Sequence, residues 1–167
     1  NNKLMLKSYF KDKIYLITGA NGRIGYALSK HLIKFGCKLI LIDINTKKIS
    51  KLNHHKIHLI KKIDITNEKK IKDLINIANK KFKKINGIVH CAYPVTKDWG
   101  QSFENVYSKS LKINLFNQLG ISILLAKRFI EYFLKNKING KIIFISSIMG
   151  VKAPKFENYK GLRMNSP

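Results

Sequence analysis

The feature that most constrains this chain is a glycine-rich turn between an apolar run and a helical pattern. The turn extends from Thr18 to Gly25 and reads Thr-Gly-Ala-Asn-Gly-Arg-Ile-Gly. It follows the apolar run 14–17 and leads into the apolar-periodic segment 26–35, which predicts a strand, a turn and a helix. Glycines let the backbone approach an anion closely, and the free N–H groups at the start of the helix point to the same place. The turn is therefore predicted to hold a phosphate group.

Apolar runs alternate with helical patterns along the rest of the chain. Strands are expected at 14–18, 39–42, 57–60, 87–91 and 141–146. Helices are expected at 23–35, within 46–52, after Asn67 and over 103–135. Strands that are apolar throughout and separated by helices indicate a parallel sheet buried on both faces. The expected fold class is α/β, with a doubly wound parallel sheet between two layers of helices, truncated after the fifth strand.

The size and hydropathy of the chain suit one globular domain over residues 1–167, with 1–12 as a leader. Its 167 residues are 45% hydrophobic. No apolar run approaches the roughly 18 residues that span a bilayer. The first residues carry charges and lack the apolar core of a signal peptide. A cytoplasmic protein without a membrane segment is therefore expected.

The cysteines and histidines predict neither a disulfide framework nor a metal site. Cys37 and Cys91 lie in or beside apolar runs and are expected to be buried free thiols. The histidines at 54, 55 and 58 form a small cluster, but no carboxylate or thiolate partner is evident nearby. They are interpreted as part of the loop before the third strand.

The formal net charge of +24 raises the question of a nucleic-acid partner. Lysines occur along the whole length, whereas the arginines are Arg23, Arg128 and Arg163. Arginine is the side chain that most often reads bases. The distribution therefore favours a lysine-rich solvated surface over a specific nucleic-acid site. Weak nonspecific binding to polyanions would still be expected.

A carboxylate ends the second expected strand, since Asp43 lies eighteen residues after Gly25. In a dinucleotide fold, a carboxylate there accepts hydrogen bonds from the adenosine ribose and repels a 2′-phosphate, which favours NAD over NADP. Arg23 and Lys47 add positive charge nearby and weaken that preference. Alternatively, Asp43 caps the next helix, but its position relative to the turn favours the ribose role.

Two serines, Ser146 and Ser147, end the fifth expected strand. Ligands of parallel sheets bind beyond the carboxyl ends of the strands, where two hydroxyls can hold a substrate carbonyl or alcohol. Serines at strand ends also commonly start turns, so the pair alone is ambiguous.

Together these residues resemble the short-chain dehydrogenase/reductase family, which has the Rossmann fold. The resemblance follows the family's order over nearly the whole chain. It is carried by the segments 18–25, Asp43, 64–65, 87–92, Asn114 and 145–150. It implies an NAD(P)-dependent oxidoreductase that transfers a hydride on an alcohol or ketone, and a homo-oligomer at full length.

The resemblance also implies roles for individual residues. Asp64 and Ile65 would contact the adenine, while 91–93 stand where the family usually has Asn-Ala-Gly beside the cofactor. Asn114 would support a proton-relay water, and Ser147 would be the catalytic serine that polarises the reacting oxygen. The implied cofactor-binding residues are Thr18, Gly19, Asn21, Gly22, Arg23, Ile24, Gly25, Asp43, Asp64, Ile65, Cys91, Ala92 and Tyr93.

The glycine spacing departs from the commoner form of the family, which has glycine where Arg23 stands. Gly19, Gly22 and Gly25 follow the three-residue spacing typical of members that act on sugar nucleotides. The segments 91–94 and 153–159 resemble a branch in bacterial pathways for nonulosonic-acid and flagellin or surface-glycan sugars. A sugar-derived substrate is therefore expected, with a sugar-nucleotide epimerase or dehydratase as the alternative.

The family's catalytic pair, a tyrosine and a lysine four residues later, has no counterpart after Ser147. Tyr159 is followed four residues later by Arg163, which keeps a positive charge but is interpreted as coincidence. The sequence is therefore interpreted as a fragment that begins a substrate loop at 151–167 and is inactive alone. A non-catalytic dinucleotide-binding protein is the remaining alternative.

Overall fold

Strands and helices alternate from the first strand onward. The computed structural model describes residues 2–52, 55, 57–82, 84–101, 103–153 and 155–159. The strands are β1 (Ile14–Thr18), β2 (Lys38–Asp43), β3 (Ile57–Lys62), β4 (Gly87–His90) and β5 (Lys141–Phe144). The α-helices are α1 (Asn2–Phe10), α2 (Arg23–Lys34), α3 (Glu68–Phe82), α4 (Ser108–Leu115) and α5 (Ile121–Lys135). Shorter helical segments are η1 (Ile49–Lys51), η2 (Phe103–Asn105), η3 (Phe116–Gly120), η4 (Ile148–Gly150) and η5 (Phe156–Tyr159).

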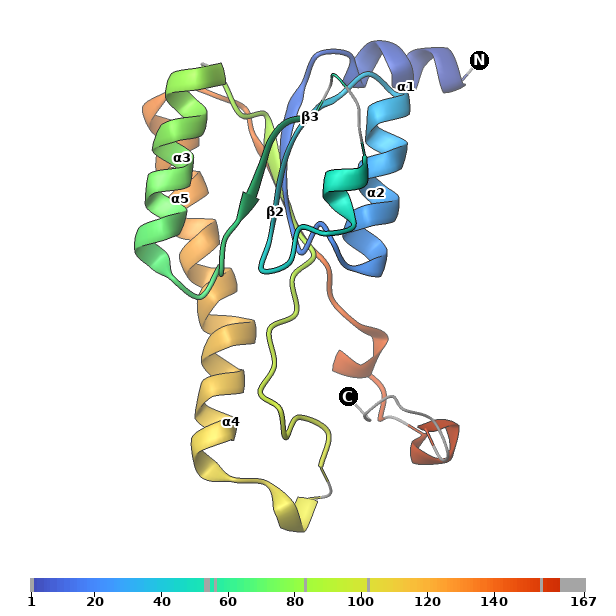
Figure 1. Cartoon of the computed structure of the whole chain (residues 1–167), viewed down its shortest axis with the longest axis vertical. Coiled ribbons are helices and arrows are strands. Elements are labelled where there is room, and N and C mark those ends of the chain that lie inside the picture. Colours follow the sequence, from blue (N-terminus) through green and yellow to red (C-terminus); the bar gives the residue numbers. More distant parts are fainter. Residues whose placement is uncertain are drawn as a thin grey trace.

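The strands form one parallel sheet in the order β3-β2-β1-β4-β5. The chain winds outward from β1 to β3 and then returns to place β4 on the other side of β1. Helices α1 and α2 lie on one face of the sheet, and α3 and α5 lie on the other (Figure 1). This arrangement confirms the predicted doubly wound α/β fold with three layers. The winding direction reverses between β1 and β4, which is where ligands bind in such sheets.

Two apolar cores fill the space between the layers. The larger core joins the sheet to α3 and α5, and Phe129 of α5 is fully buried in it. The smaller core joins the other face of the sheet to α2 and η1, through Leu32 and Ile49. These helices carry apolar residues at helical spacing, as in Ile71, Leu74 and Ile75 of α3, because a helix buries one face against the sheet.

The structure differs from the sequence expectations in the helical parts. Helix α1 was not predicted, because its apolar residues follow no clear helical stripe and Leu4 and Met5 remain exposed. The single helical region expected over 103–135 is divided into η2, α4, the π-helical η3 and α5. Cys37 is buried as expected, whereas Cys91 is half-buried. Within the described part of the chain, no helix is long and apolar enough to cross a membrane.

Candidate nucleotide-binding site

The glycine-rich turn connects β1 to α2 at the carboxyl edge of the sheet. Gly19 has φ +62°, and a Cβ atom built there would lie 2.6 Å from the Cα atom of Ala92. Both the dihedral angle and the close approach require glycine. Helix α2 begins after Gly22, which has no side chain with which to cap the helix. Gly22, Arg23 and Ile24 are exposed, so the first turn of α2 can present its N–H groups to an anion.

Asp43 and Asn21 join this turn to the segment after β2. Asp43 Oδ2 accepts a hydrogen bond of 2.9 Å from the Asn21 backbone N–H, and its Oδ1 accepts one from Asn45. Asn21 Oδ1 accepts the backbone N–H groups of Lys48 and Ile49 at 2.8 and 3.1 Å. Asp43 is therefore placed beside the turn as predicted. Its contact with Asn45 starts a turn rather than a helix, and the next helix, η1, has Lys48 at its N-cap, so the helix-capping alternative is not what the structure shows.

The loop after β4 is held against the glycine-rich turn. The Cys91 N–H donates to the Thr18 carbonyl oxygen at 3.2 Å, and the Ala92 N–H donates to Thr18 Oγ1 at 3.4 Å. Burial raises the pKa of the Cys91 thiol to about 11, so it stays protonated at neutral pH. Tyr93 is 59% exposed and meets Trp99 edge-on, with ring centroids 6.2 Å apart. Tyr93 thus brings an aromatic surface to this edge, at the position where the family usually has glycine.

Asn114 is buried in α4 and anchors the same loop from the other side. Its Oδ1 accepts the Thr96 backbone N–H at 2.9 Å, and its Nδ2 donates to Thr96 Oγ1 at 2.8 Å. The side chain is 3% exposed. The carboxamide therefore positions the loop, a role that the sequence did not indicate.

Ser147 follows β5 at the same edge of the sheet. Its Oγ accepts the Met149 N–H at 3.2 Å and so caps η4, as expected of a serine that starts a turn. The hydroxyl proton is not used in that bond. The residue is exposed and can still donate to a ligand oxygen.

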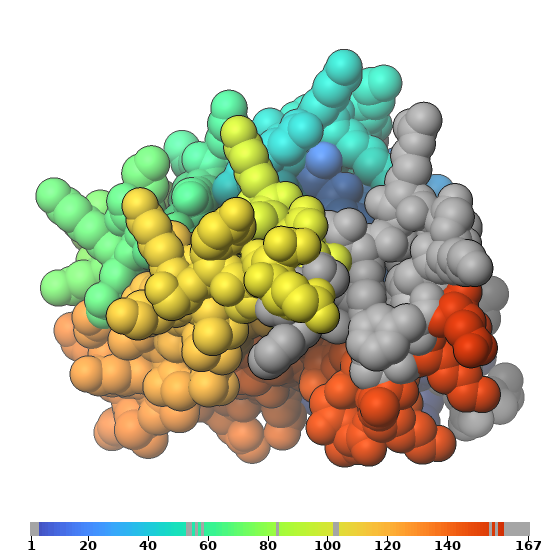
Figure 2. Space-filling view, turned by 90° about the horizontal axis from the view of Figure 1, so that it is seen from below, coloured from blue at the N-terminus to red at the C-terminus, as the bar shows by residue number. Residues whose placement is uncertain are grey.

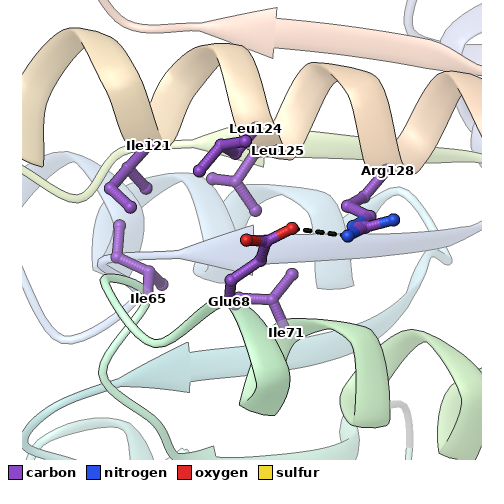
Figure 3. A pocket seen from close by; sticks show the side chains of 7 residues that line it. All are labelled: Ile65, Glu68, Ile71, Ile121, Leu124, Leu125 and Arg128. Carbon is purple, nitrogen blue, oxygen red and sulfur yellow. Dashed lines mark hydrogen bonds and ion pairs between the residues drawn. The ribbon is translucent and has the colours of Figure 1, made fainter. Parts of the chain in front are cut away.

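Asp64 and Ile65 follow β3 and lead into α3. Asp64 Oδ1 accepts hydrogen bonds from the backbone N–H and the hydroxyl of Thr66 at 2.9 and 2.8 Å. Ile65 is 5% exposed and packs in the narrow apolar pocket between α3 and α5, which Glu68 and Arg128 close with an ion pair (Figure 3). An adenine contact at Ile65 would therefore involve its backbone rather than its side chain.

The segments that carry these residues converge on one face of the molecule. Figure 2 shows this face from below, with the segments that follow β2 (cyan), β4 (yellow) and β5 (red) all visible on it. Parallel strands end at the same edge, so residues far apart in sequence meet there. Residues 160–167, including Arg163, and His54 lie outside the described residues.

One buried polar residue at this edge that the sequence analysis did not single out is His90, the last residue of β4. It is 5% exposed, and its Nδ1 lies 2.6 Å from Thr18 Oγ1. Burial lowers the pKa of His90 to about 4, so the imidazole is neutral at neutral pH. The signal was a polar side chain at the end of an otherwise apolar strand, next to the segment 91–93.

Comparisons with known proteins agree with this geometry. The family model described as short chain dehydrogenase matches residues 13–161. The chain belongs to the short-chain dehydrogenase family. It is 40% identical to the post-translational flagellin modification protein A of Campylobacter coli, over 93% of this chain and 63% of that protein. It is 31% identical to the 3-oxoacyl-[acyl-carrier-protein] reductase FabG of Rickettsia typhi, over 90% of this chain and 60% of that protein.

Solved structures share the same fold. A short chain dehydrogenase from Leptospira borgpetersenii with bound NAD+ superposes with a TM-score of 0.80 at 23% identity, over 94% of this chain and 60% of that chain. A 4-hydroxyisoleucine dehydrogenase complexed with NADH gives a TM-score of 0.69 at 22% identity, over 86% of this chain and 59% of that one. The chain thus spans 63% and 60% of the two curated relatives named above.

Proposed function

We propose that this short-chain dehydrogenase chain binds NAD and provides the cofactor half of an oxidoreductase that acts on an alcohol or ketone. The observation that carries the proposal is the uncapped start of α2 at Gly22, with Asp43 bonded to the same turn. Gly19 lies so close to Ala92 that no side chain fits there, which brings the turn and the loop after β4 together where the winding direction of the sheet reverses. The bound nicotinamide would supply hydride transfer.

The proposed roles of the residues follow from where they lie. The N–H groups at 23–25 would bind the diphosphate, and Asp43 would accept hydrogen bonds from the ribose hydroxyls with its remaining lone pairs. Asp64 and Ile65 would border the adenine, and residues 91–93 would line the nicotinamide side. Ser147 would polarise the reacting oxygen by donating its hydroxyl proton. Asn114 would support the proton-relay water from α4, the helix that it connects to the loop at Thr96.

We expect NAD rather than NADP, because the carboxylate of Asp43 faces the turn and would repel a 2′-phosphate. Isothermal titration calorimetry on this chain tests the binding, with Asp43→Ser as the variant. The wild type should bind NAD+ weakly and NADP+ more weakly. In Asp43→Ser, the affinities for NAD+ and NADP+ should be closer to each other. Absence of binding by the folded protein would refute the proposal.

The substrate is proposed to be sugar-derived. Support comes from the spacing of Gly19, Gly22 and Gly25 and from the similarity to a protein named for flagellin modification. The same spacing favours a second candidate, a sugar-nucleotide epimerase or dehydratase. Product analysis of the full-length enzyme separates the two, since an epimerase or dehydratase regenerates its NAD whereas an oxidoreductase consumes it. This chain by itself is expected to show no hydride transfer, and turnover would direct attention to Tyr159.

We also propose that the full-length protein is a cytoplasmic homo-oligomer that makes no specific contact with nucleic acid. Exposed apolar side chains recur along α4, η3 and α5, at Leu111, Leu115, Phe116, Leu119, Ile123, Ile130 and Leu134. A second copy of this stripe would bury it. Light scattering after size exclusion of the full-length protein should show an oligomer for the wild type and a monomer for Leu119→Lys.

A further inference from the structure

A buried polar pair joins β1 and β4, the two strands between which the winding direction of the sheet reverses. Thr18 ends β1, His90 ends β4, and the two residues are neighbours in the parallel register. Residues that lie side by side in a sheet project from the same face. Thr18 is 0% and His90 5% exposed, and the separation of 2.6 Å between Thr18 Oγ1 and His90 Nδ1 is that of a strong hydrogen bond.

The donor and the acceptor in this pair follow from the third partner. The backbone N–H of Ala92 can only donate, and it donates to Thr18 Oγ1 at 3.4 Å. If the Thr18 hydroxyl donates to a bare Nδ1, every group in the chain of three has a complementary partner. If Nδ1 instead carried a proton, the Thr18 oxygen would accept two bonds and its own buried proton would need a further acceptor, which is costly. This pattern of donors and acceptors favours a neutral imidazole that is protonated at Nε2.

The same imidazole also contacts β5. Its ring meets Phe144 edge-on, with centroids 5.6 Å apart, and the His90 carbonyl oxygen accepts the Ile145 N–H at 3.1 Å. Phe144 lies three residues before Ser147. His90 thus touches the strand that leads to the glycine-rich turn and the strand that leads to Ser147.

From this placement we propose that His90 is a positioning residue for the cofactor site. Acting through Thr18 Oγ1, its Nδ1 lone pair holds the Ala92 N–H, and with it the loop 91–93, against Gly19. The contact of Gly19 with Ala92 has no slack, because a Cβ on Gly19 would lie 2.6 Å from both the Cα and the N atom of Ala92. Loss of the hydrogen bond from Ala92 to Thr18 Oγ1 would therefore let the two segments that we propose line the dinucleotide move apart. This inference rests on the proposed function.

Two substitutions at position 90 separate positioning from packing. His90→Asn places a carboxamide oxygen where Nδ1 lies and keeps the acceptor. His90→Phe keeps the ring and its contact with Phe144 but removes the acceptor. In calorimetry with NAD+, His90→Asn should bind within about threefold of the wild type, whereas His90→Phe should lose at least tenfold. Thr18→Val should lose as much as His90→Phe, and the double variant no more than either, because both changes break one link.

Two measurements need no cofactor, so that failure of this proposal is distinguishable from failure of the proposed function. Long-range nitrogen–proton NMR of the wild type should show His90 protonated at Nε2. Amide hydrogen exchange at Ala92 should be at least tenfold faster in His90→Phe than in His90→Asn. A wild type that does not bind NAD+ but shows both results refutes the proposed function alone. A proton on Nδ1, equal exchange in the two variants, or equal NAD+ affinity of wild type and folded His90→Phe would overturn the positioning role. If His90→Phe does not fold, the tautomer and the loss expected of Thr18→Val decide.

Discussion

The two faces of the sheet are covered to different extents, although the strands place apolar side chains on both faces. On the face toward α2, the row Leu41, Ile17, Val89, Ile143 is 0, 0, 5 and 48% exposed from β2 to β5. On the face toward α5, Ile142 of β5 packs partly into the larger core. Helix α5 reaches β5, whereas the described residues place no helix over Ile143. Burial of an apolar strand is thus decided by the layer above it and not by the strand itself.

The largest expected effect tests this difference within one row. Ile17→Ala should lower the free energy of unfolding by about 3–4 kcal/mol, because it leaves a cavity in a fully buried site. Ile143→Ala should cost less than about 1 kcal/mol, because that side chain is already half-exposed. Urea unfolding followed by circular dichroism measures both. Equal losses would show that β5 is covered in solution, for instance by a second copy of the chain.

The next effect concerns His90, which lies on the face toward α5. Its pKa is lowered from 6.5 to about 4 by burial, so the unfolded chain takes up the proton at higher pH than the folded one. The contribution of neutral His90 to the free energy of unfolding is therefore intact above pH 6.5. It is lost as the pH falls from 6.5 to 4, by up to about 3 kcal/mol. Unfolding curves between these pH values should show this slope for the wild type. His90→Asn does not titrate, so its stability should lack this dependence on pH. If the stabilities of wild type and variant changed in parallel with pH, the lowered pKa of a buried His90 would be contradicted.

A smaller effect compares two glycines, one at the buried junction and one beyond the exposed strand. Gly19→Ala should cost about 2 kcal/mol, because alanine is strained at φ +62° and its Cβ meets Ala92. It should also weaken NAD+ binding. Gly150→Ala is the control, since a Cβ added there meets no atom within 4 Å, and it should change stability by less than about 0.5 kcal/mol. Thermal unfolding with and without NAD+ measures both variants.

The smallest effect lies on the outer side of the well-covered face. Arg128 of α5 pairs with Glu68 of α3 and with Glu131, and these side chains are partly exposed. Exposed ion pairs contribute little because water and salt screen them. Glu68→Gln should therefore lower the free energy of unfolding by about 0.5 kcal/mol at low salt and by less at high salt. A loss near that of Ile17→Ala would mean that the ion pair, rather than apolar packing, holds α3 on α5.

The sequence predicted the strands well, because a run of mostly apolar residues marks each of them. The runs at 14–18 and 57–60 became β1 and most of β3, and Asp43 ends β2 beside the turn as expected. Helix α1 and the break at η3 were missed because neither has a strong local signal. The roles assigned to Ser147 and Asn114 stay predictions.

The pairings within the site could not be predicted, because they join residues far apart in the chain. Thr18 and His90 are 72 residues apart, and Thr96 and Asn114 are 18 apart. Nothing in either local pattern shows which hydroxyl meets which acceptor. The same holds for Ile65, whose neighbours on α5 bury the side chain that the resemblance placed beside an adenine.

The sequence by itself determined the parallel α/β fold and the glycine-rich turn, because apolar periodicity and glycine spacing are local properties of the chain. The tertiary structure decided which apolar surfaces are covered and which polar groups meet. Asn21 became a brace for η1, Asn114 an anchor for Thr96, and His90 the partner of Thr18. Those contacts form only when the sheet brings the ends of separate strands together, and a buried polar group then takes the partner that the register places beside it.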